Sequence, residues 1–287
     1  MSVSTRRLSA YVGLIKPRII ELLLITTVPA MVLAAGGWPG WRLVGATLFG
    51  GVLSAGGANA VNNFVDRDID VHMERTRRRS LPTKAVGAGE ALVLGVTLGV
   101  AGFLWLWWAT TLLAALLATA AFAFYIFVYT LMLKRTTPQN IVIGGAAGAV
   151  PALVGWAAVT GTVGLPAWIL FAIVFFWTPP HFWALALRFE EDYARAGVPM
   201  LPVVAGERET TLQIALYAAV VAVVSLLLQP AASLGAIYLV SAIALGVGFV
   251  AFALALIRDR ARAMLVFRYS NIYLALLFAA AMLDVLV

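Results

Sequence analysis

Apolar residues along the chain fall into nine long runs that are separated by short polar segments. The runs cover residues 19–36, 41–61, 90–109, 111–133, 140–160, 166–188, 210–228, 233–256 and 269–286. A helix needs about 20 mainly apolar residues to cross the hydrocarbon core of a bilayer. The runs are continuous rather than alternating between apolar and polar residues, which excludes a transmembrane β-barrel. The sequence therefore predicts an all-α polytopic membrane protein with about nine transmembrane helices.

The composition supports this interpretation. Of the 287 residues, 63% are hydrophobic and 11% are charged, whereas soluble domains carry about 25% charged residues. The chain has no cysteine, which excludes a disulfide framework, a thiolate metal site and a cysteine nucleophile. No break in composition and no long polar linker interrupts the pattern, so we expect residues 1–287 to form a single domain.

The 20 lysines and arginines are sorted to one side of the predicted topology. All except Arg42 lie in the N-terminal segment or in the loops that follow the second, fourth, sixth and eighth runs. Cytoplasmic loops are enriched in Lys and Arg, so we expect the N-terminus and these loops to lie in the cytoplasm of a cell-membrane protein. Topology then explains the net charge of +7, and we expect no nucleic-acid partner.

An unusual cluster of acidic and amide side chains lies at the cytoplasmic end of the second run. Asn62, Asp66 and Asp70 are spaced four residues apart and share one helix face, and Asn59 extends this stripe one turn deeper. Asp68 points elsewhere. Carboxylates at a helix C-terminus are disfavoured by a few tenths to about 1 kcal/mol each, so the cluster needs cations. Nearby arginines or Mg²⁺, which prefers carboxylate and phosphate oxygens, would supply them.

Two simpler explanations apply to this loop. The aspartates could form a solvated helix end with internal salt bridges, and the run RTRRR at 75–79 could anchor the topology and contact anionic lipids. Asn59 and Asn62 favour a functional explanation, because amides that enter the hydrocarbon region are costly unless they serve a polar cavity. Carboxylates and arginines together suit a ligand that is both anionic and metal-bound, such as a diphosphate.

A second polar cluster ends the run 166–188, on the same side of the membrane. The Pro-Pro pair at 179–180 is predicted to break this helix within the membrane, as happens where a cavity accepts the freed carbonyls. His181 follows the pair, and Arg188 and Asp192 come later at helical spacing. A lone histidine is more often a satisfied interior residue than a ligand, and both explanations remain open here.

Two further segments bring polar side chains to the same side. Tyr125 lies deep in the fourth run, and Lys134 and Arg135 follow at its end. Lys16 and Arg18 precede the first run. Tyrosines near a membrane interface usually belong to its aromatic belt, but Tyr125 lies deep enough to face a pocket.

These motifs resemble the UbiA superfamily of intramembrane prenyltransferases. The residues that carry the resemblance are KPRIIELLLITTVPAM at 16–31, NNFVDRDIDVHMERT at 62–76, PALVGW at 151–156, WTPPHFWALAL at 177–187 and DYARAGVPMLPVV at 192–204. They cover nearly the whole chain. The resemblance is closer still to the branch of the superfamily that farnesylates haem.

The resemblance implies a fold, an activity and a metal. The fold would be nine transmembrane helices around a central cavity that opens toward the lipid and is capped by two cytoplasmic loops. The activity would be transfer of the farnesyl group of farnesyl diphosphate to a vinyl group of haem B, with addition of water, giving haem O and diphosphate. Mg²⁺ would be the cofactor and haem B a substrate, and membrane lipids, haem A synthase and cytochrome oxidase assembly proteins would be candidate partners.

The resemblance also implies roles for individual residues. The expected metal ligands are Asn62, Asp66 and Asp70. Relatives carry aspartates where this chain has His181 and Arg188, which leaves His181 open to contact either haem or the diphosphate. Arg188 and His181 complete the predicted catalytic set. The predicted substrate contacts are Lys16, Arg18, Asn59, Arg67, Arg75, Arg77, Tyr125, Lys134, Arg135 and Asp192.

Two alternatives remain. The same fold could prenylate another acceptor, such as an aromatic acid or a chlorin. A cation-coupled transporter could use the carboxylates as an ion site, but such transporters place their sites near the membrane midplane between inverted repeats. In this sequence the carboxylates lie at one face and no repeat is visible.

Overall fold

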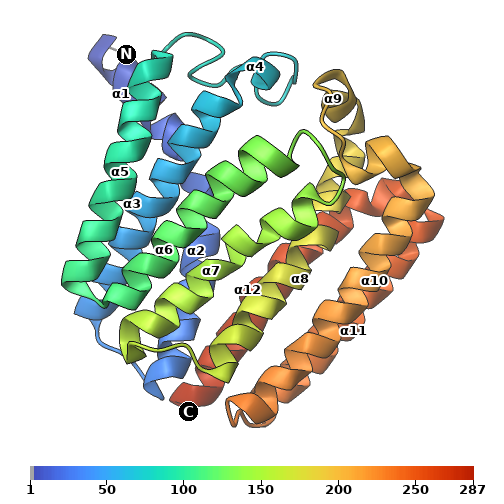
Figure 1. Cartoon of the computed structure of the whole chain (residues 1–287). Coiled ribbons are helices and arrows are strands. Elements are labelled where there is room, and N and C mark those ends of the chain that lie inside the picture. Colours follow the sequence, from blue (N-terminus) through green and yellow to red (C-terminus); the bar gives the residue numbers. More distant parts are fainter. Residues whose placement is uncertain (1–2) are drawn as a thin grey trace.

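The chain folds into a bundle of long helices that lie side by side (Figure 1). A computed structural model describes residues 3–287, with the side chains of residues 7–17 and 25–287. Every regular element in that range is helical. The elements are α1 (Val3–Ile15), α2 (Pro17–Ala35), α3 (Trp41–Val65), α4 (Arg67–Asp70), α5 (Ala88–Ala109), α6 (Leu112–Ala123), the π-helix η1 (Phe124–Leu133), α7 (Asn140–Thr160), α8 (Leu165–Arg188), α9 (Glu190–Arg195), α10 (Leu201–Ala231), α11 (Ala236–Arg258), the 3₁₀-helix η2 (Arg260–Arg262) and α12 (Ala263–Leu286).

The predicted all-α membrane architecture is confirmed. Eight helical segments in the described part of the chain are long and apolar enough to cross a membrane, and they correspond to the second to ninth predicted runs. The first predicted run, 19–36, falls on α2, where the described apolar segment Ile25–Ala35 is shorter. The protein is therefore an integral membrane protein.

Small residues allow α3 and α5 to pack closely. A methyl group added at Gly57 would come within 2.6 Å of the Gly95 carbonyl oxygen, and one added at Gly95 within 2.5 Å of the Val61 side chain. Close backbone approach of this kind is typical of helix pairs in membranes. On α5, Val93 and Val100 are exposed, as expected of side chains that face lipid. The α3–α5 pair thus forms one wall of the bundle.

The two halves of the bundle differ in packing. The largest core cluster joins α2, α7, α8, α10, α11 and α12, and it buries large side chains such as Trp183, Tyr238, Phe249 and Tyr273. In the other half, small residues of α3, α6 and α7 line a cavity that α2 also borders. The site described below lies at one end of this cavity.

One prediction about the helices is wrong. The Pro-Pro pair at 179–180 does not break α8, which runs without interruption from Leu165 to Arg188. Each proline removes one backbone hydrogen bond and crowds the carbonyl four residues earlier. Packing of α8 against α7, α10 and α12 holds the helix together across the pair, as neighbouring helices commonly do for prolines in membranes.

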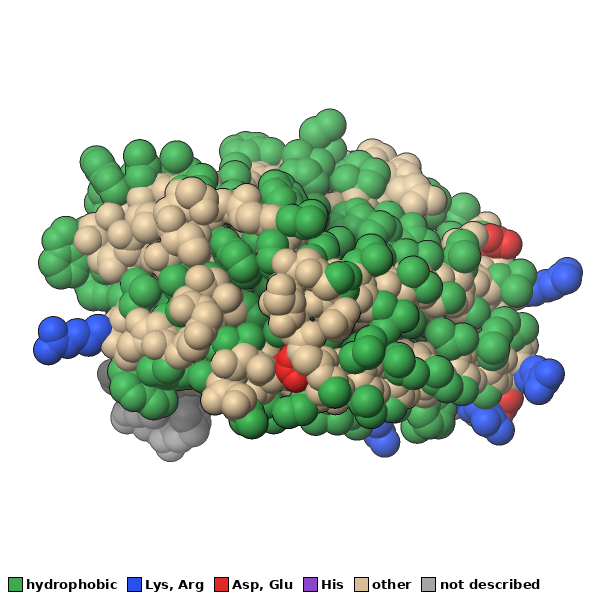
Figure 2. Space-filling view, turned by 90° about the horizontal axis from the view of Figure 1, so that it is seen from below, with side chains coloured by type: hydrophobic (Ala, Val, Ile, Leu, Met, Phe, Trp, Pro, Cys, Tyr) green, Lys and Arg blue, Asp and Glu red, His purple; other side chains and the backbone are tan. Residues whose placement is uncertain are grey.

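The two ends of the bundle differ in polarity. The short helices α4 and α9 lie together at one end, and the C-terminus lies at the other (Figure 1). Seen from the C-terminal end, the surface is mostly hydrophobic or uncharged, and basic side chains appear mainly at the rim (Figure 2). At the other end, Arg135 after η1 pairs with Asp68 of α4, and Arg260 of η2 pairs with Glu190 of α9, so the basic loops after the fourth and eighth predicted runs share the α4 and α9 end.

We predict that this basic end faces the cytoplasm. Reporter fusions after Lys84, Lys134 and Arg208 should report the cytoplasm, and fusions near Thr110 and Thr162 the opposite side, because Lys and Arg accumulate in cytoplasmic loops. At each position, the measurement compares the activities of two fusions, one with a reporter that is active only in the cytoplasm and one with a reporter that is active only outside it. A reversed result at any two positions would show that the chain is inserted the other way or has a different span count.

Candidate active site

The Asn62, Asp66 and Asp70 side chains are buried at the end of α3. The helix ends at Val65, but the backbone N–H of Asp66 still donates to the Asn62 carbonyl at 2.9 Å, and that of Asp70 to the Asp66 carbonyl at 2.9 Å. The spacing of one helical turn therefore continues across the junction with α4. The Asn62 amide donates to Asp66 Oδ2 at 2.8 Å, so these two side chains are joined directly, and Asp70 follows one turn later on the same face.

Three cations from separate segments meet this cluster. Lys134 Nζ lies 2.5 Å from Asp66 Oδ2, and Lys16 Nζ donates to Asn62 Oδ1 at 2.8 Å. Arg79 contacts both carboxylate oxygens of Asp70, at 3.2 and 3.0 Å. Burial, together with the charges of Arg79 and Lys134, lowers the pKa of the Lys16 ammonium to about 7.

The π-helix η1 gives Lys134 its position. The backbone N–H of Lys134 donates to the Tyr129 carbonyl five residues earlier, at 2.8 Å. The Thr130 hydroxyl donates to the Tyr125 carbonyl at 2.7 Å and accepts from the Asn62 amide at 3.1 Å. π-Helical turns are rare and frequently occur at functional sites. Thr130 is a site residue that the sequence analysis missed, because nothing in FYIFVYTLML signals a π-helix.

Helix α1 is attached to α3 by side-chain amides. Asn63 donates to the Leu14 carbonyl at 2.9 Å, and Asn59 to the Ile15 carbonyl at 3.3 Å. These bonds satisfy carbonyls at the C-terminus of α1, where intrahelical partners are missing. Lys16 follows directly, with a left-handed backbone at φ 52°. The Asn59 amide, which we predicted to contact substrate, therefore holds the C-terminal end of α1 in place, and this positions Lys16 beside Asn62.

Removing the Asn63 anchor should loosen α1. We expect Asn63→Ala to lower the thermal midpoint in detergent, because a carbonyl left without its partner costs about 1–3 kcal/mol. Asn271→Ala is a matched control, since this exposed amide bonds only to a carbonyl of its own helix α12. An Asn63→Ala variant that melts at the same temperature as the wild-type protein would contradict the anchoring role.

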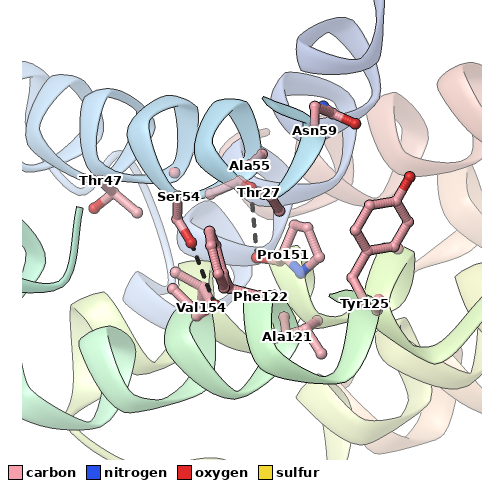
Figure 3. Close-up of a pocket in the computed structure, with 16 residues that line it drawn as sticks. Thr27, Thr47, Ser54, Ala55, Asn59, Ala121, Phe122, Tyr125, Pro151 and Val154 are labelled. Carbon is pink, nitrogen blue, oxygen red and sulfur yellow. Dashed lines mark hydrogen bonds between the residues drawn. The ribbon is translucent and has the colours of Figure 1, made fainter. Parts of the chain in front are cut away.

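An apolar cavity of about 200 Å³ extends from this polar cluster into the membrane region. Asn59 and Tyr125 lie at one end of it and Thr47 at the other (Figure 3). Thr47 and Asn59 are twelve residues apart on α3, which corresponds to about 18 Å along the helix axis. Most other lining residues are alanine, glycine, valine, proline or phenylalanine. The cavity therefore suits an extended hydrocarbon chain whose polar head lies at Asp66.

The α4 loop and α9 meet over the polar end of the bundle. The backbone N–H of Arg75 donates to Asp192 Oδ2 at 3.3 Å, and its guanidinium donates to the Tyr193 hydroxyl at 3.3 Å. Asp192 is buried and also pairs with Arg195. Two predicted substrate contacts, Arg75 and Asp192, thus join the two loops to each other. Arg188, a predicted catalytic residue, does not contact the Asp66 cluster. It lines a separate cavity together with Arg75 and Asp192.

His181 belongs to α8, and its side chain faces α12. Its ring is stacked between Trp177 and Phe267, at centroid distances of 4.2 and 4.6 Å, and its Nδ1 lies 2.8 Å from Ser270 Oγ. The structure does not bring His181 to the Asp66 cluster or into the walls of the apolar cavity. Its surroundings match the simpler explanation, a satisfied interior histidine.

The remaining predicted contacts divide into two groups. Arg135 pairs with Asp68 at 2.7 Å and approaches Asp66 at 3.9 Å, so it borders the cluster. Arg67 is exposed and donates to the Phe64 carbonyl instead. Arg77 is also exposed. The side chain of Arg18 lies outside the described residues.

The cluster fits a metal that is shared with a ligand. Asp66 Oδ1 is buried and has no hydrogen-bond partner. Across the described residues there is no group of three or more His, Cys, Asp or Glu side chains that could hold a metal alone. Mg²⁺ is commonly bound by one or two carboxylates together with substrate phosphates. Asp66 and Asp70 would supply those carboxylates, whereas the Asn62 amide oxygen already accepts a hydrogen bond from Lys16.

Comparison with known proteins gives consistent results. The UbiA prenyltransferase family model matches residues 23–281. The protoheme IX farnesyltransferase of Parafrankia sp. is 52% identical over 282 residues, covering 96% of this chain and 90% of the relative. The enzyme of the same name from Thermus thermophilus is 52% identical over 276 residues, covering 96% of this chain. The chain spans only 45% of that longer relative.

Solved structures match the fold. One, from work on digeranylgeranylglyceryl phosphate synthase in membranes, has a TM-score of 0.80 at 18% identity and covers 97% of this chain and 98% of its own. A UbiA homologue from Archaeoglobus fulgidus bound to DMAPP and Mg²⁺ has a TM-score of 0.63 at 15% identity, with coverage of 94% and 98%. At such identities the likeness concerns the fold alone.

Proposed function

Because the chain belongs to the UbiA prenyltransferase family, we propose that it transfers the farnesyl group of farnesyl diphosphate to a vinyl group of haem B. The reaction consumes one water and releases diphosphate, and its product is haem O. The observation that carries this proposal is the 52% identity over 96% of the chain to a protoheme IX farnesyltransferase. The apolar cavity that ends at a charged cluster supports it independently.

The charged cluster would bind the diphosphate and promote its departure. Mg²⁺ would be held by Asp66 and Asp70 and, when bound, would stabilise negative charge on the leaving diphosphate. Lys16, Lys134 and Arg79 converge on the same place and would neutralise the remaining charge. Fixed cations that face developing charge in a site shielded from water are among the strongest contributions to catalysis.

The apolar cavity would hold the farnesyl chain and protect the allylic cation from water. Tyr125 lines its polar end, where the face of the ring can stabilise a cation. The terminal vinyl carbon of haem B then forms the new carbon–carbon bond to C1 of the farnesyl group. The positive charge moves to the carbon next to the porphyrin ring, where water adds and loses a proton. A hydroxyethylfarnesyl side chain results.

The choice of acceptor can be tested with purified protein in detergent. We expect diphosphate release from farnesyl diphosphate to be stimulated by haem B, and not by an aromatic acid or a chlorin. Protein lacking any acceptor gives the background rate. Stimulation by an aromatic acid or a chlorin instead of haem B would replace the proposed acceptor while leaving the prenyltransferase assignment intact.

A further inference from the structure

A second cavity, of about 800 Å³, lies at the polar end of the bundle, and its lining includes none of Asn62, Asp66 and Asp70. It is bordered by the α4–α5 loop, the end of α8, helix α9 and η2. Four arginines line it, together with acidic, aromatic and aliphatic side chains. The lining residues that matter here are Arg75, Arg188, Arg195, Arg260, Phe189 and Leu187.

Two of these arginines are already neutralised. Arg195 pairs with Asp192. Arg260 pairs with Glu190 at 2.6 Å and with Glu207 at 3.1 Å. Their charges therefore serve to fix the walls of the cavity and are not free for a ligand.

The guanidinium groups of the other two arginines have no carboxylate partner among the described side chains. Arg75 donates to the Tyr193 hydroxyl and lies over the Phe189 ring, 5.7 Å from its centroid. Arg188 forms no ion pair or hydrogen bond with any residue in the part of the chain that the structure describes. Glu74 and Glu191 also border the cavity, but both are exposed and neither contacts Arg75 or Arg188. The cavity thus offers two guanidinium groups beside an aromatic ring.

A haem acceptor needs partners of this kind. It carries two propionate carboxylates on an apolar ring system, and arginine binds carboxylates through paired hydrogen bonds. The apolar cavity, at about 200 Å³, suits a prenyl chain, and the cations around Asp66 are engaged there. The second cavity is larger and carries the unpaired arginines.

The second cavity is also close to the reaction site. Arg75 and Arg79 belong to the same short loop, and Arg79 contacts Asp70. Tyr193, which bonds to Arg75, packs in one apolar cluster with Ile69 of α4 and with Tyr129 of η1. An acceptor anchored at Arg75 would therefore extend toward the diphosphate cluster across this apolar layer.

We propose that Arg188 and Arg75 bind the propionate carboxylates of the acceptor, which places its vinyl edge toward Asp66 and Asp70. This inference rests on haem B being the acceptor. The geometry gives Arg188 a binding role and separates it from the diphosphate site.

The test compares haem B with haem B whose two propionates are esterified. With the wild-type protein, esterification should raise the acceptor KM about ten- to a hundredfold, because charge-assisted hydrogen bonds are lost. Arg188→Gln should raise the KM for haem B by part of this factor, and esterification should then raise the KM less than it does for the wild-type protein, because only the contact with Arg75 remains to be lost. Arg188→Lys should lie between the two. The KM for farnesyl diphosphate should stay unchanged throughout.

A matched control and a lipid comparison complete the test. Arg208→Gln removes another exposed arginine at the same end of the bundle, outside the cavity lining, and should change neither KM. If Arg188→Gln raised the KM for haem B and the KM for its ester by the same factor, the proposal would be overturned. A rise confined to the KM for farnesyl diphosphate would also overturn it. If Arg188→Gln raised the KM for haem B only in vesicles that contain anionic lipid, and not in zwitterionic vesicles, Arg188 would bind lipid headgroups instead and the proposal would be overturned. If wild-type protein farnesylates neither acceptor, the proposed function itself fails.

Discussion

Replacing Asp66 with asparagine should reduce kcat by about 10²–10³-fold, which corresponds to roughly 3–4 kcal/mol of transition-state stabilisation. Asp66 is buried, it is bonded to Lys134 and Asn62, and its Oδ1 has no hydrogen-bond partner among the described residues. Asparagine keeps the size of the side chain but removes the charge that a metal needs. The measurement is the initial rate of diphosphate release at saturating substrates and equal protein concentration.

Asp68→Asn is the matched control for this variant. Asp68 lies two residues away in the same segment, but its side chain is 59% exposed and bonds only to Arg135. The Arg135 guanidinium lowers the pKa of this carboxyl well below its usual range. Such an exposed ion pair is worth little, so we expect a change of less than about fivefold. Similar losses in both variants, or near-normal turnover of Asp66→Asn, would contradict the role of the buried cluster.

Removing divalent cations should abolish turnover. Asp66 and Asp70 provide only two carboxylates, and the remaining ligands of the metal must come from the diphosphate and water. We expect no activity above background after exhaustive EDTA treatment. Mg²⁺ or Mn²⁺ should restore it, because both favour oxygen ligands. The same assay of diphosphate release reports the loss and the recovery.

The protein itself provides the control for chelation. Thermal melting should be largely unchanged by EDTA, since no group of three or more potential ligands in the described residues forms a structural metal site. Full turnover after chelation would show that Lys16, Lys134 and Arg79 handle the diphosphate without a metal.

The sequence predicts the fold well because the bilayer imposes a fixed length on each helix. Continuous apolar runs of about 20 residues are therefore reliable signals. The prediction of a break at the Pro-Pro pair is wrong because it assumed that a cavity accepts the freed carbonyls, whereas neighbouring helices pack against α8 on several sides and keep it continuous.

The sequence locates the acidic cluster but not all of its partners. Asn62, Asp66 and Asp70 remain on one face beyond the end of α3, because backbone hydrogen bonds between residues four apart continue into α4. Arg79 contacts Asp70, whereas Arg77 is exposed, and the run RTRRR contains nothing that distinguishes them. That choice depends on the path of the α4–α5 loop, which is set by tertiary contacts.

Other site features are also tertiary. The Asn59 amide was predicted to contact substrate because amides in a membrane need polar partners, and its partner is the Ile15 carbonyl. Any acceptor in an adjoining segment would have satisfied the same argument. His181 is held by Ser270 of α12, 89 residues later in the chain, and no local pattern specifies such a pairing.

The most direct test of the account is the mass of the haem recovered after reaction. Purified protein is incubated with haem B, farnesyl diphosphate and Mg²⁺, and the extracted pigment is analysed by mass spectrometry, with Asp66→Asn in parallel. We expect wild-type protein to convert haem B to a haem heavier by one farnesyl group and one hydroxyl, and the variant to do so at least about 10²-fold more slowly. Haem B recovered unchanged while wild-type protein consumes farnesyl diphosphate would contradict it.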